Sequence, residues 1–128
     1  MSVEQEVQGA LIGALGTISG LNGVFDGPVA KSSAPWAETG ELLRLDWSTK
    51  DIAGCEMRTG IIIRDRAATP ERVHQLADAA GAAVEALPRT LGDWRIASLM
   101  MMRQRIVRDG PGQWAALIEH RLRLLAEG

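Results

Sequence analysis

Residues 55–64, CEMRTGIIIR, show the clearest structural pattern in the chain. Cysteine, methionine, threonine and two isoleucines occupy every second position, and the positions between them carry charged residues, a glycine and one further isoleucine. Because successive side chains of a strand point to opposite sides, this period of two predicts a β-strand with one face toward a core. A shorter alternation of apolar and charged residues precedes it, at Leu43, Arg44, Leu45, Asp46 and Trp47. Residues 35–47 are therefore predicted to form a neighbouring strand.

A helix is predicted to follow this strand, beginning at Thr69-Pro70-Glu71. A hydroxyl that can cap, a proline at the first helical position and an acid in the first turn are typical of a helix start. Apolar residues then recur at helical spacing and supply one buried face: Val73, Leu76, Ala77, Ala80, Val84 and Leu87. Pro88 is expected to end the helix.

Another helix is predicted at the N-terminus, with Ser2 as its cap and apolar residues at helical spacing: Val3, Val7, Ala10, Leu11, Ala14, Leu15 and Ile18. Gly20 and the Asn22-Gly23 pair are expected to end it. Its internal glycines, Gly9, Gly13 and Gly16, are expected to allow close packing against a sheet. Val24-Phe25 then suggests a short edge strand, followed by a loop over residues 26–34.

The last third of the chain fits two structures. Residues 94–108 and 114–127 lie on either side of a compact turn, Asp109-Gly110-Pro111-Gly112. As strands they form a long hairpin, and one face of the first arm then carries Trp94, Ile96, Ser98, Met100 and Met102. The second arm also suits a helix, because alanine, leucine, glutamate and arginine favour one. Pattern alone leaves both possibilities open.

The composition indicates one folded domain over residues 1–128. Hydrophobic residues make up 46% of the chain and charged residues 23%, which excludes general disorder. The net charge of -2 gives no global signature of nucleic-acid binding. Cys55 is the single cysteine, so a cytosolic or assembled-particle setting is expected. The acidic N-terminus argues against a secretory signal, and no apolar run is long enough to predict a membrane span.

The sequence lacks the motifs that usually mark catalytic or metal sites. Gly-x-Ser-x-Gly, His-Glu-x-x-His and Cys-x-x-Cys are all missing, so no catalytic residue, cofactor or metal is expected. His74 is predicted to lie on the exposed side of its helix, and His120 has no acid or cysteine at ligand spacing. Cys55 is interpreted as a packed residue rather than a nucleophile. The carboxylates Asp46, Asp51 and Glu56 are predicted to be solvated charges.

Two clusters in the last third point to a contact surface. Arginines concentrate there against an acidic average, and in a hairpin Arg103 and Arg105 share one face of their strand, as Arg121 and Arg123 do of theirs. Such a strip could contact acidic subunits or passing DNA, or form an ordinary solvated face. The run Met100-Met101-Met102 places adaptable apolar groups on both faces of a strand. Tryptophans are also enriched at interfaces, and Trp47 is one of four here.

Several local strings resemble a known family. They are, in chain order, Val24-Phe25-Asp26, Pro35-Trp36, Asp46-Trp47-Ser48-Thr49-Lys50, Thr69-Pro70 and Arg105-Ile106-Val107-Arg108-Asp109-Gly110. With the order of elements, these resemble the small tail-terminator, or tail-completion, proteins of siphophages, prophages and gene transfer agents. The resemblance covers nearly the whole chain. The Trp36 position often carries another aromatic residue in the family, and the Gly-Pro-Gly turn and the methionine run depart from it.

The resemblance implies an α+β fold, with a mainly antiparallel sheet, a long C-terminal β-hairpin and two α-helices on one side. It implies no catalytic residues and a ring, commonly of six subunits, at the head-proximal end of a tail tube, assembled in the bacterial cytoplasm. The expected partners are further copies of the chain, the tail tube protein, the head–tail connector or stopper, and DNA that passes through the ring without sequence recognition. No membrane partner is expected. The residues expected at the subunit or tube interface are Asp46, Trp47, Met100, Met101, Met102, Arg103, Arg105, Arg121 and Arg123.

Three other functions remain compatible with the sequence. A head–tail stopper or other neck protein would show similar features. A binding module with a small-molecule pocket between helices and sheet would be a monomer or dimer stabilised by its ligand. A small enzyme would need a cleft holding titratable groups with strongly shifted pKa values.

Overall fold

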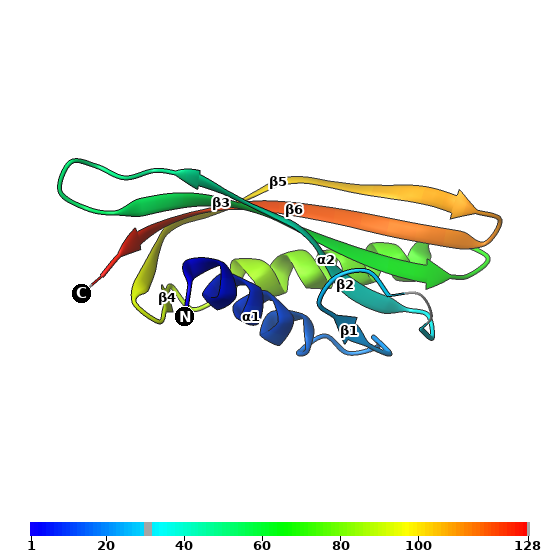
Figure 1. Ribbon diagram of the computed structural model, residues 1–128. Coiled ribbons are helices and arrows are strands. Elements are labelled where there is room, and N and C mark those ends of the chain that lie inside the picture. The colour runs from blue at the N-terminus through cyan, green and yellow to red at the C-terminus, as the bar shows by residue number, and fades with distance from the viewer. Residues whose placement is uncertain (30–31, 128) are drawn as a thin grey trace.

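The computed structural model describes residues 1–29 and 32–127, and places two helices on one face of a six-stranded sheet (Figure 1). The sheet has the order β1-β2-β3-β6-β5-β4, and all neighbouring strands are antiparallel except β1 and β2. This confirms the α+β fold and the C-terminal hairpin. Of the predicted loop 26–34, residues 30 and 31 lie outside the described residues. The elements are α1 (Val3–Leu15), β1 (Val24–Phe25), β2 (Trp36–Asp46), β3 (Gly54–Arg66), α2 (Glu71–Glu85), β4 (Thr90–Leu91), β5 (Trp94–Gly110) and β6 (Gln113–Ala126).

The ambiguous second arm of the last third is strand β6. Its helix-favouring residues adopt an extended conformation because β6 lies between β3 and β5 and pairs with both along nearly its whole length. Backbone hydrogen bonds on both edges outweigh the weak intrinsic preference of leucine, alanine and arginine for a helix.

The predicted common face of the first arm, from Trp94 to Met102, is wrong. Register shifts between Ile96 and Ser98 and between Met101 and Arg103 insert extra residues into β5. Each bulge changes which side the following residues face. Ile96 therefore pairs with the buried Leu124, whereas Ser98 and Met100 pair with Arg123 and Arg121 on the other side of the sheet.

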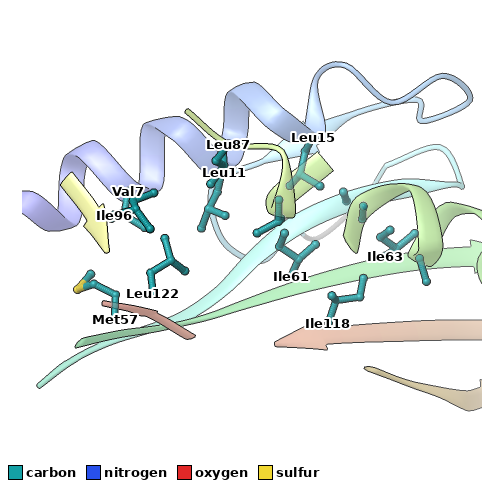
Figure 2. Close-up of a cluster of buried hydrophobic side chains, with 14 of the residues drawn as sticks. Val7, Leu11, Leu15, Met57, Ile61, Ile63, Leu87, Ile96, Ile118 and Leu122 are labelled. Atoms are coloured by element: carbon teal, nitrogen blue, oxygen red, sulfur yellow. The ribbon is translucent and has the colours of Figure 1, made fainter. Parts of the chain in front are cut away.

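The core lies between the helices and one face of the sheet. Alternate residues of β3 and β6 point toward the helices and are fully buried, among them Met57, Ile61, Ile63, Ile118 and Leu122. Residues of α1 at helical spacing meet them from the other side: Val7, Leu11 and Leu15 (Figure 2). The two periodicities, 2 in the strands and 3.6 in the helices, thus supply two apolar surfaces that cover each other.

The helix ends differ in part from the expectations. Ser2 caps α1, and Gln5 completes a capping box with it, as the sequence suggested for Ser2. The helix ends at Leu15, before Gly20, and an added Cβ at Gly9 or Gly13 would meet open space, so these glycines do not serve close packing. Helix α2 has Pro70 as its N-cap residue without a side-chain cap bond, so the predicted capping by Thr69 is wrong.

The sheet is longer than the helices that cover it. Figure 1 shows the β2–β3 hairpin projecting beyond the N-terminal end of α1 as an arm. Strand β4 pairs only with Trp94 and Arg95, so most of β5 forms a free edge of the sheet within the described chain. Three register shifts and several arginines occur along that edge, features that discourage indiscriminate pairing with other strands.

Candidate assembly surface

The face of the sheet opposite the helices is called the open face here. In β3 and β6, side chains on this face belong to the residues between the buried ones, and in the described part of the chain no helix covers them. The register places the four predicted arginines together on this face, because Arg103 is opposite Glu119, Arg105 opposite Leu117, Arg121 opposite Arg58, and Arg123 opposite Glu56. The central part of the open face includes Leu43, Leu45, Glu56, Arg58, Gly60, Ile62, Met100, Arg103, Arg105, Leu117, Glu119, Arg121 and Arg123.

An ion cluster around Glu56 organises one end of the open face. Arg123 Nε donates to Glu56 Oε1 at 3.1 Å, and Arg58 Nε donates to Oε2 at 3.1 Å. Arg121 Nε lies 4.0 Å from the same carboxylate. The hydrogen bond from Arg123 is the main reason that the pKa of the Glu56 carboxyl falls below its usual value; burial opposes this shift and Arg58 adds to it. Glu56 is 7% exposed, so its prediction as a solvated charge is wrong.

Trp47 extends this cluster toward the end of the β2–β3 arm. The Arg123 guanidinium lies 5.4 Å from the centre of the Trp47 ring, a cation–π arrangement. Asp46 has another role: its Oδ1 accepts hydrogen bonds from the Ser48 hydroxyl at 2.7 Å and the Ser48 amide at 3.2 Å. Asp46 therefore shapes the turn, whereas Trp47 contacts Arg123 of the open face.

The three methionines are all exposed but do not form one patch. Met100 lies on the open face, where Arg121 Nη2 approaches its Sδ at 3.2 Å. Met101 is opposite His120, whose side chain is buried on the helix-covered side. Met102 lies at the register shift between Met101 and Arg103. Their exposed fractions, 42–49%, leave each of them available for contact.

A groove of about 350 Å³ opens in the middle of this face, around Gly60. Two residues of β2, Gly40 and Glu41, lie opposite this single residue of β3, because the register of the pair shifts there. Gly60 leaves space, since a Cβ at this position would have no atom nearer than 3.9 Å. The lining combines apolar side chains with charged ones on the rim: Leu43, Ile62 and Leu117 with Glu41, Arg58, Arg103 and Glu119.

Arg103 and Glu119 form an ion pair on the rim of the groove, with 2.8 Å between Arg103 Nη2 and a Glu119 carboxylate oxygen. Sequence reasoning missed Glu119, Arg58 and the groove. The alternation of β3 does place Glu56, Arg58 and Gly60 on one face, and that signal could have grouped them. Their partners come from β2, β5 and β6, and only the strand register identifies those.

Groups with potential chemistry elsewhere are isolated from one another. Among the described residues, no three histidine, cysteine or acidic side chains come together as a metal site. Burial raises the pKa of the Cys55 thiol, which fits the packed role expected for it. His74 is exposed on α2, as predicted, and His120 is buried beneath that helix layer.

A family model for tail completion protein gp17 matches residues 5–123 of the chain, which include every strand and both helices nearly in full. The chain belongs to this family. It therefore has a structural role in a phage-like tail, as the strings quoted above suggested. A chain of the solved structure titled "Virion of native gene transfer agent (GTA) particle" has a similar fold, with a TM-score of 0.70 and 22% sequence identity. The match covers 93% of this chain and 94% of that one.

A search of curated proteins finds no match. The helices within residues 1–29 and 32–127 are too short or too polar to cross a lipid bilayer.

Proposed function

We propose that this tail completion protein forms a ring, most simply a hexamer, on the head-proximal end of a tail tube. The ring ends tube polymerisation, presents a joint to the head connector and lets DNA pass without reading its sequence. The protein acts as a structural subunit rather than an enzyme, within the tail or neck of a virion or gene-transfer-agent particle. Family membership supports the setting, and the shape of the fold supports the assembly role.

The open face is the observation on which this proposal rests. One face of the sheet is packed against helices, and no described helix or strand covers the other, so a large surface is left for another protein. Its two carboxylates, Glu56 and Glu119, are each paired with arginines, so docking would not leave them unpaired. Five arginines outnumber these two acids, so the face is positive and suits an acidic partner surface. Exposed apolar groups between them, including Leu43, Leu45 and Met100, provide area to bury.

The nine residues expected at the interface divide between three roles in this proposal. Trp47, Met100, Arg103, Arg105, Arg121 and Arg123 contribute directly to the open face and contact a neighbouring subunit or the tube. Asp46 acts indirectly, by fixing the turn that follows β2. Met101 and Met102 lie along the free edge of β5 and form a separate apolar contact.

The test is whether the protein limits the length of tubes. Purified tube protein would be polymerised with and without this chain, and tube lengths measured in negative-stain images. We expect a rising ratio of this chain to tube protein to shorten the tubes, with a ring on one end only. Light scattering after gel filtration would give the number of subunits in any ring that forms alone. Tubes of unchanged length with no end density would refute the capping role.

A further inference from the structure

The groove around Gly60 and the tip of the β2–β3 arm carry apolar and charged groups that complement each other. We propose that the tip, residues 49–53, of one copy docks into the Gly60 groove of the next copy, so that this contact joins neighbouring subunits. The inference rests on the proposed ring and names the surfaces that would build it. The occupant of the groove is thus a second copy of this chain.

The tip presents one exposed aliphatic side chain next to two charged residues. Ile52 is 45% exposed, and it follows Lys50 and Asp51 in the turn. The turn is held by local hydrogen bonds: Thr49 N donates to Ile52 O at 2.9 Å, and Ile52 N donates to Thr49 Oγ1 at 3.1 Å. Because these bonds already fix the turn, docking would cost little additional ordering.

The base of the tip is also fixed. Ser48 Oγ accepts from Gly54 N at 3.0 Å, and Trp47 N donates to Gly54 O at 3.0 Å. These hydrogen bonds fix the positions at which the tip joins the two strands. Ile52 is therefore presented on a rigid support, as a contact residue that inserts into a pocket usually is.

The groove provides the matching features. Its floor is apolar, with Ile62 and Leu117 beside the empty space above Gly60. On its rim, the positive charge of Arg58 complements the negative charge of Asp51. The negative charge of Glu41 complements the positive charge of Lys50. Arg103 and Glu119 neutralise each other there. An aliphatic side chain preceded by one charge of each sign therefore fits a floor and rim of this composition.

The tip cannot reach its own groove. Gly60 lies six residues beyond Gly54 on the same strand, which corresponds to roughly 20 Å of extended chain. In Figure 1 the arm points away from the body of the sheet. A donor surface and an acceptor surface at different places on one subunit generate a head-to-tail contact, which closes into a ring when the rotation between copies allows it.

Two variants that each block one half of this contact provide the test. Gly60→Leu fills the groove and leaves the tip intact, whereas Ile52→Asp removes the aliphatic side chain of the tip and leaves the groove intact. We expect each variant alone to remain a single chain under conditions where the wild type forms rings. An equimolar mixture should give a two-chain species and no ring, because one complete contact per pair remains. Gly9→Leu adds the same bulk on α1, where there is open space, and should assemble normally.

A cross-linking version does not depend on rings forming in solution. In a Cys55→Ala background, a chain with Ile52→Cys is oxidised together with a chain carrying either Gly60→Cys or the control Gly9→Cys. Docking raises the local thiol concentration to the millimolar range, so at ~0.1 mM protein the Gly60→Cys partner should link about tenfold faster than the control. Equal rates for the two partners, or rings formed normally by Gly60→Leu, would overturn the inference.

The two proposals can fail separately. If the wild type shortens tubes but Ile52→Cys shows no preference for Gly60→Cys, capping holds and the subunit contact lies elsewhere. If the preference is clear but the wild type never shortens tubes, copies join as inferred and the capping role is wrong.

Discussion

The two faces of β3 differ in burial and in the kind of side chain that they carry. Residues 55, 57, 59, 61 and 63 face the helices and are buried, whereas residues 56, 58, 60 and 62 face the other way and hold an ion cluster, a groove and one isoleucine. Folding stability therefore depends mainly on the covered face, since apolar area leaves water there. The open face buries less apolar area, and it is the surface on which the proposed assembly contacts lie.

Each face also contains residues that differ from this division into a buried apolar face and an exposed charged one. On the covered side, Thr59 and His120 lie opposite each other, and neither the Thr59 hydroxyl nor either His120 ring nitrogen has a hydrogen-bond partner among the described residues. On the open side, Glu56 is nearly buried by its arginines. The comparison predicts that substitutions on the covered face change the free energy of unfolding, and that substitutions on the open face change assembly.

Leu122→Ala should have the largest effect on folding. Leu122 is fully buried on the covered face of β6, and removing three carbons there leaves a cavity, which costs about 2–5 kcal/mol of unfolding free energy. Urea denaturation followed by circular dichroism would measure it. Leu117→Ala, on the open face of the same strand, is the matched control and should cost clearly less. Similar losses for the two would mean that the open face is packed as well.

The next effect concerns His120. Burial lowers the pKa of its imidazole below the ordinary value of 6.5, and the nearby Glu85 charge opposes this only in part. Below pH 6.5 the unfolded chain therefore binds a proton before the folded chain does, so stability should fall as the pH drops toward the folded-state pKa. Its two unpartnered nitrogens also cost free energy at neutral pH, so His120→Leu should raise stability by about 1–3 kcal/mol.

Denaturation curves at several pH values between 5 and 8 would check both statements. The loss of stability between pH 6.5 and pH 5 should be smaller in His120→Leu than in the wild type. The same loss in both would assign the pH dependence to other groups. A destabilised variant would show that the imidazole shape is needed for packing.

Trp47→Ala should have a smaller effect. The ring is half-buried at the end of β2 and contacts the Arg123 guanidinium, so its removal should cost about 1–2 kcal/mol through lost apolar area and the lost cation–π contact. Trp47→Phe keeps an aromatic face for Arg123 and should recover part of this. Thermal unfolding of the wild type, Trp47→Ala and Trp47→Phe would measure these differences in stability. No recovery by phenylalanine would show that the contact with Arg123 contributes little.

Local patterns predicted most of the elements. The alternation in residues 55–64 identified β3 and its buried face, and the spacing from Val73 to Val84 identified the buried face of α2, because both signals need only the next few residues. Strand β6 could not be assigned this way. Its composition fits a helix, and its strand conformation depends on pairing with β3, more than fifty residues earlier in the chain.

The candidate site was predictable in type but not in geometry. Strand periodicity predicted that Arg103 and Arg105 share one face of β5, and that Arg121 and Arg123 share one face of β6. That all four share one face depends on the register between β5 and β6, including a bulge that no local signal locates. Glu56 was expected to be solvated for the same reason, since Arg123, the main cause of its lowered pKa, comes from another strand.

Reversing Arg103 and Arg105 to glutamate should change folding least and assembly most. The Arg103 side chain is 61% exposed, and its pair with Glu119 is of the surface kind that contributes at most about 1 kcal/mol. The double variant should therefore unfold within about 1 kcal/mol of the wild type. Its rings or tube caps should be lost, because reversing two charges changes the charge of the proposed contact surface by four units. Arg66→Glu with Arg108→Glu makes the same change in net charge at exposed positions near the far end of the sheet. If this control pair assembles normally and the open-face pair does not, the face itself is responsible; equal failure of both would attribute the loss to net charge and remove the support for an open-face interface.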